Sequence, residues 1–183
     1  MGAHEHRAHG QAAVACAVLT ASDTRTRDTD TSGARARALL EAAGHRVVAS
    51  AILPDDPARI RAWIEERLAD PTVDVVVVNG GTGLAPRDTT FEAVAGLLEK
   101  RIDGFGELFR MLSYQEIGAA AMLSRAVAGV ARGRVVVSVP GSTAAVELAL
   151  AKLLVPELGH MVGLVRGAER AHEPPSGGHD PGR

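Results

Sequence analysis

Lysine is almost absent from this chain of 183 residues, in which Lys100 and Lys152 are the only two. A Walker A phosphate-binding loop needs a Gly-Lys pair followed by serine or threonine. Neither lysine follows a glycine, and both fall in segments whose pattern predicts helices. The sequence therefore excludes this phosphate loop, and any phosphate site must be built from other residues.

Cysteine, aromatic residues and long apolar runs are also scarce. Cys16 is the single cysteine and lies in an apolar run, which predicts a core residue, no disulfide framework and a reducing compartment. Aromatic side chains make up 3% of the chain and the formal net charge is −2, which gives no sign of a general nucleic-acid surface. No apolar run approaches the roughly 20 residues needed to cross a membrane, and the N-terminus lacks the apolar core of a signal peptide. We therefore expect a cytoplasmic protein with neither nucleic acid nor a membrane among its partners.

Glycine, by contrast, is concentrated where a strand is expected to end. Residues 75–78 are four consecutive valines, too short for a helix and too uniformly apolar for a half-exposed strand, so they predict a strand buried on both faces. Residues 79–83 then read Asn-Gly-Gly-Thr-Gly, where glycines permit positive φ and let backbone N–H groups converge on an anion. A dinucleotide-binding fingerprint is excluded because Pro86 stands where its third glycine would be. The stretch predicts a different kind of phosphate cradle.

A helix is predicted directly after this loop. Thr89 followed by Glu92 is a capping-box pattern, which predicts a helix over residues 90–100 with its N-terminus facing the glycines. The alternative is a glycine turn that merely reverses the chain, but such turns seldom bring an Arg-Asp pair such as Arg87 and Asp88 with them. The pair favours the phosphate cradle.

Strands and helices alternate through most of the chain, which predicts an α/β fold. The expected architecture is a three-layer α/β/α domain with a mostly parallel sheet and one short hairpin. The hairpin is expected from the apolar runs 126–130 and 135–139, which are separated by a short polar turn. At this length and with 46% hydrophobic residues, one domain is expected. The single domain is predicted over residues 13–167, between disordered tails at 1–12 and 168–183.

Parallel strands bring the loops at their carboxyl ends to one edge of the sheet, and ligands of such folds bind along that edge. The loops expected there are 20–32, 54–55, 80–88 and 140–143. The glycine loop offers N–H groups, and the other candidate groups are the hydroxyls of Ser22, Thr82 and Ser142 and the carboxylates of Asp55 and Asp88. Asp56 is set apart because it precedes Pro57 and is expected to cap a helix.

A phosphate beside two carboxylates requires a counter-charge. At about 4 Å and an effective dielectric near 20, one carboxylate repels one phosphate charge by roughly 4 kcal/mol, whereas a helix terminus returns only about 0.3–1 kcal/mol. Mg2+ held by one or two carboxylates and by phosphate oxygens resolves the conflict. Unless Asp55 and Asp88 never meet, the sequence therefore predicts a magnesium site and nucleotidyl or phosphoryl transfer.

At these residues the chain resembles the MoaB/MogA family of molybdenum cofactor biosynthesis proteins, which includes the gephyrin G domain. The resemblance covers residues 14–164 and rests on four motifs in the family's order and spacing. They are G-G-T-G-L-A-P-R-D-T-T from Gly80, G-F-G-E from Gly104, L-S-R from Leu123 and V-P-G-S from Val139. The resemblance implies a three-layer α/β/α fold that binds molybdopterin and, in active members, uses Mg-ATP to adenylylate its terminal phosphate with release of pyrophosphate.

The resemblance also assigns roles by position. Asp55 and Asp88 match the two catalytic aspartates, which act through Mg2+. The glycines Gly80, Gly81 and Gly83 match the loop around the nucleotide phosphates, Pro140 and Gly141 match the turn beside the nucleoside, and Ser22, Ser124 and Arg125 match positions on the pterin and phosphate side. The loops themselves add Thr82, Arg87 and Ser142 to the expected binding residues. The family forms homotrimers or hexamers, for which residues 105–117 are the candidate contact, and works with other proteins of cofactor biosynthesis.

Three departures place the chain nearer the MoaB branch, not all of whose members are catalytic. Asn79 stands where threonine or serine often precedes the glycines, Phe91 replaces a frequent proline, and Ser142-Thr143 replaces the Asn-Pro or Gln-Pro of the clearest adenylyltransferases. Two readings follow. The chain is a molybdopterin adenylyltransferase, which the retained Asp55 and Asp88 favour, or it binds and carries molybdopterin or its precursor without chemistry.

Overall fold

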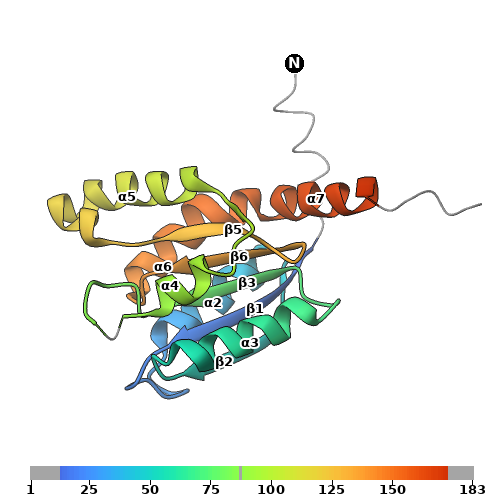
Figure 1. Ribbon diagram of the computed structural model, residues 1–183. Coiled ribbons are helices and arrows are strands. Elements are labelled where there is room, and N and C mark those ends of the chain that lie inside the picture. Colours follow the sequence, from blue (N-terminus) through green and yellow to red (C-terminus); the bar gives the residue numbers. More distant parts are fainter. Residues whose placement is uncertain (1–12, 87, 173–183) are drawn as a thin grey trace, which may run out of the picture.

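The structure is a computed structural model that describes residues 13–86 and 88–172, with side chains as far as Gly167. Arg87, the predicted tail at 1–12 and residues 173–183 of the second predicted tail lie outside this part. A six-stranded sheet in the order β2-β1-β3-β6-β5-β4 runs through the molecule, with helices on both sides of it (Figure 1). The predicted three-layer α/β/α fold with a mostly parallel sheet is confirmed.

Four parallel strands build the side of the sheet that positions the site. They are β1 (Ala15–Ala21), β2 (Arg46–Leu53), β3 (Val75–Asn79) and β6 (Arg134–Val139). Every residue of β1 and β3 is buried, which is why both read as continuous apolar runs. The edge strand β2 instead alternates between exposed and half-buried residues.

The antiparallel side of the sheet is larger than predicted. β5 (Val127–Ala131) forms the expected hairpin with β6, turning at Arg132 and Gly133, which both have positive φ. A short strand, β4 (Lys100–Arg101), pairs antiparallel with β5 beyond it. The predicted helix over 90–100 is therefore wrong in its second half. It ends early because the chain turns after Gly96 and the Glu99 N–H donates to the Val130 carbonyl (2.9 Å).

Each face of the sheet carries its own core. On one face, α3 (Pro57–Ala69) and α4 (Thr90–Ala95) pack against β1, β3 and β6 through Ile60, Ile64, Leu68 and Val94. On the other face lie α2 (Thr31–Ala42), α5 (Asp103–Ile117), α6 (Thr143–Ala149) and α7 (Val155–His172), which contribute Leu40, Phe109, Val146 and Leu158. As predicted, Cys16 lies in this second core.

A π-helical segment, η2 (Leu150–Leu154), joins α6 to α7. The described residues include one helix, Thr143–Gly167, that is long and apolar enough to cross a membrane by length and mean hydropathy (1.5), where the sequence was expected to contain none. Large buried side chains recur every four residues at Val146, Leu150, Leu154, Leu158 and Val162 and belong to the core against the sheet. Packing against the sheet therefore accounts for the apolar residues on one face of this helix, of whose most apolar window 39% is buried. The helix continues to His172, past the predicted domain end at 167.

Candidate functional site

A cavity of about 400 Å3, the central pocket, opens where the carboxyl ends of β1, β3 and β6 meet. It is the place at which ligands of parallel α/β sheets are expected. Its walls come from the ends of these strands and from the segment before β5, and they include Thr20, Ser22, Arg25, Asn79, Gly80, Gly81, Thr82, Gly83, Asp88, Leu123, Ser124, Pro140 and Gly141. The structure thus brings together most of the residues that the sequence indicated.

Backbone packing explains the glycines of this pocket. Gly80 and Gly81 have φ of 115° and 54°, which residues with a Cβ rarely adopt. A Cβ on Gly80 would also collide with the Ala21 carbonyl oxygen at the end of β1, and a Cβ on Gly141 would lie 2.9 Å from the Gly80 Cα. The three chain segments therefore meet backbone to backbone at the floor of the pocket.

The glycine loop presents free hydrogen-bond donors. The Gly80 N–H donates to the Val139 carbonyl (3.1 Å), but no described residue accepts a hydrogen bond from the N–H groups of Gly81, Thr82 or Gly83. Successive backbone donors of this kind form an anion-binding concavity. The loop at the mouth of the pocket has the chemistry of a phosphate cradle.

Helix α4 contributes less than expected. It begins at Thr90 as predicted, but it has six residues, and its first N–H donates to the Gly81 carbonyl (3.1 Å). The predicted capping box is wrong, because Thr89 makes no side-chain cap and Glu92 pairs with Arg125 instead. The anion donors therefore belong to the loop and not to the helix N-terminus.

Both candidate carboxylates touch the glycine loop. Asp55, just after β2, accepts a hydrogen bond from the Thr90 hydroxyl (3.4 Å), and its Oδ1 occupies the space that a Cβ on Gly81 would need. Asp88 accepts the Ala85 N–H (3.0 Å), and its Oδ2 lies 2.5 Å from the position of a Cβ on Gly83. The two carboxylates thus reach the loop at positions two residues apart.

This donor set fits a divalent cation of the magnesium type. Carboxylate oxygens are ligands that Mg2+ prefers, and one or two of them are enough when substrate phosphates complete the coordination. Within the described ranges there is no cluster of three or more His, Cys, Asp and Glu side chains that could hold a metal. If a cation binds beside the glycine loop, Asp55 and Asp88 are the carboxylates that would hold it.

Arg125 supports the glycine loop from behind. Its guanidinium donates to the carbonyl oxygens of Thr82 (2.9 Å), Gly83 (2.6 Å) and Asp88 (3.1 Å), and it also pairs with the Glu92 carboxylate. It lies over the ring of Phe91, 4.8 Å from the centroid. The hydrogen bond from Arg125 holds the pKa of Glu92 below its ordinary value. The position that the resemblance assigned to substrate binding is thus occupied by a side chain that positions the loop.

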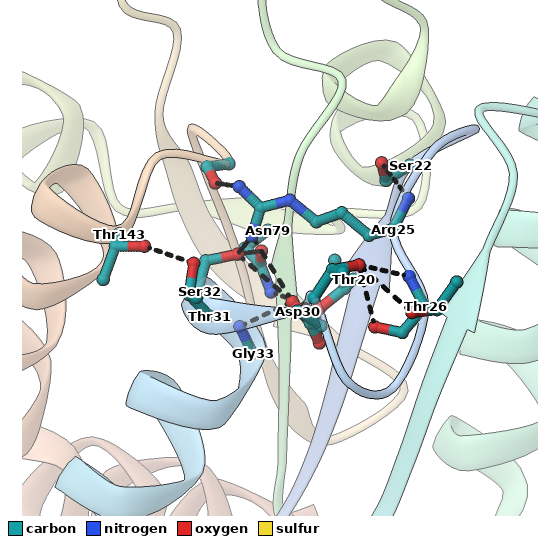
Figure 2. A network of polar contacts seen from close by, with 12 residues as sticks. Thr20, Ser22, Arg25, Thr26, Asp30, Thr31, Ser32, Gly33, Asn79 and Thr143 are labelled. Carbon is teal, nitrogen blue, oxygen red and sulfur yellow. Dashed lines mark hydrogen bonds and ion pairs between the residues drawn. The ribbon is translucent and has the colours of Figure 1, made fainter.

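A buried polar network beneath the pocket was missed by sequence reasoning (Figure 2). Its centre is Asp30, the N-cap of α2, which is 2% exposed and accepts hydrogen bonds from the Thr20 hydroxyl (2.9 Å) and the Gly33 N–H (2.9 Å). Asn79 donates to the Leu19 carbonyl (3.1 Å) and to Thr20 Oγ1 (3.0 Å). The network ties the end of β3 to the end of β1 and to α2.

Arg25 extends this network across the pocket. It donates to Ser32 Oγ (2.6 Å), which in turn donates to Asn79 Oδ1 (2.8 Å), and it lies 3.5 Å from Asp30. Its second nitrogen donates to the Gly141 carbonyl (3.1 Å) in the turn after β6. One signal for Asp30 was present in the sequence, since an aspartate three residues before Gly33 at a helix start is a capping pattern. The rest of the network depends on which strands are neighbours.

Two predicted residues, Ser142 and Ser22, differ from the others in what their side chains do. Ser142 caps α6, where its hydroxyl accepts the Ala145 N–H (3.1 Å), and it is not a wall of the central pocket. Ser22 is a wall, but its hydroxyl accepts the Arg25 N–H (3.2 Å) and so also shapes the loop. Arg87 lies outside the described residues.

A second cavity, of about 390 Å3, adjoins the central pocket at Ser124. Its walls come mainly from α5, from the 3₁₀ helix η1 (Gly118–Leu123) and from the residues before β5. They carry the three arginines Arg101, Arg110 and Arg125 and the two carboxylates Asp103 and Glu107, and Arg101 pairs with Asp103 (3.4 Å). The site as a whole therefore has two adjoining compartments, one with the free N–H donors of the glycine loop and one with charged side chains of both signs, in which arginines outnumber carboxylates.

Comparison with known proteins adds to this geometry. Residues 17–160 match the family model described as a probable molybdopterin binding domain. The chain is 50% identical over 163 residues to molybdenum cofactor biosynthesis protein B of Halalkalibacterium halodurans, covering 88% of this chain and 96% of the relative. Among solved structures it resembles a molybdenum cofactor biosynthesis protein B at 49% identity and a TM-score of 0.84, over 86% of this chain and 98% of that one. It also resembles the tungsten cofactor synthesizing protein MoaB from Pyrococcus furiosus, at 35% identity and a TM-score of 0.76, over 84% and 98% of the two chains.

Proposed function

The chain belongs to the family of molybdopterin-binding domains that includes the molybdenum cofactor biosynthesis proteins B, and from that premise we propose that it adenylylates molybdopterin with Mg-ATP and releases pyrophosphate. The observation that carries the proposal is the glycine loop, which offers the free N–H groups of Gly81, Thr82 and Gly83 between the carboxylates of Asp55 and Asp88. A loop that binds phosphate beside two carboxylates suits a metal-bound nucleotide better than a free anion.

In this proposal the chain acts mainly by positioning. The loop N–H groups donate to phosphate oxygens of ATP, and Arg125 keeps the loop in place through its carbonyls. The terminal phosphate of molybdopterin is already deprotonated at pH 7, and one of its oxygens attacks the α-phosphorus of ATP. The bond between that phosphorus and the oxygen that bridges it to the β-phosphorus then breaks, and pyrophosphate leaves. Mg2+ at Asp55 and Asp88 supplies the charge neutralisation that this transfer needs. Rate is gained from alignment and from charge stabilisation.

The two compartments fit a reaction of two substrates. The central pocket, with the glycine loop and Pro140-Gly141, takes the nucleotide, and the adjoining cavity beyond Ser124, with Arg101, Arg110 and Arg125, takes the anionic half of molybdopterin. Ser22, directly after β1, is a wall of the central pocket, where the resemblance expects it to contact the pterin. A reducing, cytoplasmic setting completes the proposal, since molybdopterin is a dithiolene and the single cysteine is buried.

We also propose that the chain assembles as a homotrimer or hexamer through α5 and η1. Apolar side chains gather on the outer face of these segments, with Leu108, Met111, Tyr114 and Ile117 between 47% and 63% exposed and Met122 71% exposed. A continuous apolar face of this kind is typical of a contact between subunits. Met111→Glu is expected to lower the mass measured by light scattering, whereas Leu164→Glu on α7, where the leucine is 61% exposed, leaves it unchanged.

The aspartates provide the test of the reaction. Asp88→Asn and Asp55→Asn keep the shape of each side chain but remove its charge. Since mutation of even the outer-shell partners of a metal ligand costs about 10–100-fold, each is expected to lower the rate of adenylyl transfer by at least about that factor. The matched control is Asp56→Asn, because Asp56 caps α3 by accepting the N–H groups of Ala58 and Arg59 and asparagine caps equally well. Unchanged turnover in Asp88→Asn would remove the assigned role. Tight molybdopterin binding without product in the wild type would favour a carrier.

A further inference from the structure

A larger cavity lies outside the site described above. This outer cavity, of about 650 Å3, lies between the loop after β1, helix α2 and the edge strand β2. Three arginines line it, Arg25 and Arg27 from the loop and Arg37 from α2, and residues 50–52 of β2 form its other wall. Arg25 also lines the central pocket and is the one residue that the two cavities share.

The charges around the outer cavity are not balanced. Arg25 and the buried Asp30 lie 3.5 Å apart, and Asp30 already accepts hydrogen bonds from Thr20 and Gly33. Arg27 and Arg37 form no ion pair or hydrogen bond with another described side chain. Among the described residues that line the cavity, Asp30 is the one carboxylate and it pairs with Arg25, so the three arginines outnumber it and Arg27 and Arg37 have no ion-pair partner there.

We propose that the outer cavity is a second anion-binding site, for a small organic phosphate, with Arg27 and Arg37 as its direct ligands. The guanidinium group presents a planar fork of donors that matches phosphate oxygens. Ile52 gives the opposite wall an apolar surface for the organic part of such a ligand, and Ser50 on the same face of β2 adds a hydroxyl. The volume lies within the range of cavities that bind small molecules, about 300–1,000 Å3.

This site is separate from the proposed reaction. It contains neither the glycine loop nor Asp55 or Asp88, and its residues stand on the outer side of the loop after β1. Ligand binding in the outer cavity can therefore be confirmed or refuted independently of adenylyl transfer. Both can be followed in one protein, because the two cavities have different walls apart from Arg25.

Hydrogen exchange followed by mass spectrometry tests the site on the full chain. AMP and inorganic phosphate are titrated in turn, and protection is measured for peptides that cover β2 and, separately, the glycine loop at 80–83. We expect AMP to protect the β2 peptides in a saturable manner and at lower concentration than inorganic phosphate, because the apolar wall contacts the organic part. Protection by inorganic phosphate at the lower concentration, or no saturable protection of β2 by AMP, would overturn the proposal.

Variants locate the effect. The double variant Arg27→Gln/Arg37→Gln is expected to raise the AMP concentration for half-protection of β2 at least tenfold, because each substitution deletes charge-assisted hydrogen bonds. Protection of residues 80–83 in the same variant is expected to stay within twofold of the wild type. Arg59→Gln is the matched control, since Arg59 is an exposed arginine on α3. If Arg59→Gln weakened the AMP protection of β2 as much as the double variant does, or if the double variant did not weaken it, the outer cavity would not be the binding site.

Discussion

The substitution Arg125→Gln tests whether one side chain holds the glycine loop in its working shape. Arg125 donates to the carbonyl oxygens of Thr82, Gly83 and Asp88, and its side chain is 24% exposed. Glutamine is too short and has too few donors to reach all three carbonyls. The loop carbonyls would then lose their shared partner, and the N–H groups on the same peptides would no longer be aimed at the pocket.

The magnitude follows from these contacts. Hydrogen bonds to a charged group are worth about 1.5–3 kcal/mol each, but water replaces part of that at a partly exposed side chain. The ion pair with the exposed Glu92 contributes only about 0–1 kcal/mol. We therefore expect a loss of about 2–3 kcal/mol in the free energy of unfolding. In a domain of this size that corresponds to a fall of about 4–12 °C in Tm.

The pH dependence of the effect has a definite sign. The pKa of Glu92 is lowered, first by its hydrogen bond from Arg125, so the pair stabilises the fold above the unfolded-state pKa of Glu92 and this contribution is lost as the pH falls through the lower folded-state pKa. The stability gap between wild type and Arg125→Gln should therefore narrow in acid. It should not close, because the carbonyl acceptors do not titrate.

Chemical denaturation and hydrogen exchange provide the assay. Arg125→Gln is expected to increase exchange at residues 80–88 in addition to lowering stability, and Arg125→Lys is expected to restore only part of the loss because it lacks the planar fork. Arg59→Gln again serves as the exposed control. An Arg125→Gln protein as stable as Arg59→Gln, with unchanged exchange in the loop, would refute the assigned role.

Three further predictions concern the core and the floor of the pocket. Burial, with a smaller contribution from Asp74, raises the pKa of Cys16 to about 12. The thiol should therefore fail to react with dithionitrobenzoate at pH 8 until the protein unfolds, and rapid reaction of the native protein would contradict its burial. Gly80→Ala should lower the free energy of unfolding at least about 2 kcal/mol more than Gly44→Ala, because both glycines have positive φ but only the Cβ at position 80 meets backbone; equal losses in urea would contradict this. Asn79→Ala should lower the free energy of unfolding by about 2–3 kcal/mol in urea, because the hydroxyls of Ser32 and Thr20 and the Leu19 carbonyl each lose a hydrogen-bond partner. A change below about 0.5 kcal/mol would show that the network is dispensable.

The sheet could be predicted because its signals are local. The apolar runs of β1 and β3 are continuous since both strands are buried on two faces, and Asp56-Pro57 marks the start of α3 through contacts within a few residues. The glycine loop was also visible, because a turn that needs positive φ requires glycine whatever surrounds it.

The errors arise where distant residues compete for a local pattern. Thr89 and Glu92 have the spacing of a capping box, yet Arg125, 33 residues away, pairs with Glu92. β4 has two exposed residues, so no apolar alternation marks it, and it exists because β5 offers backbone partners. Neither the loss of the capping box nor the formation of β4 can be predicted from the residues of that segment alone.

The polar floor of the site was hidden for a related reason. Asp30, Ser32 and Asn79 look like solvated loop residues, but the order of β1 and β3 in the sheet brings them together and buries them. A chain of donors and acceptors then satisfies each buried group. The sequence could indicate which residues surround the pocket, while the division between those that face ligand and those that hold the pocket open required the structure.

The most direct test of the central claim is the product formed by the wild-type protein. Purified chain, Mg-ATP and molybdopterin are incubated together, adenylyl-molybdopterin is identified by mass spectrometry, and pyrophosphate release is measured in parallel. The account predicts both products in equal amounts, dependent on Mg2+. Molybdopterin that is bound and recovered unchanged, with no pyrophosphate released under conditions in which an active family member turns over, would contradict it.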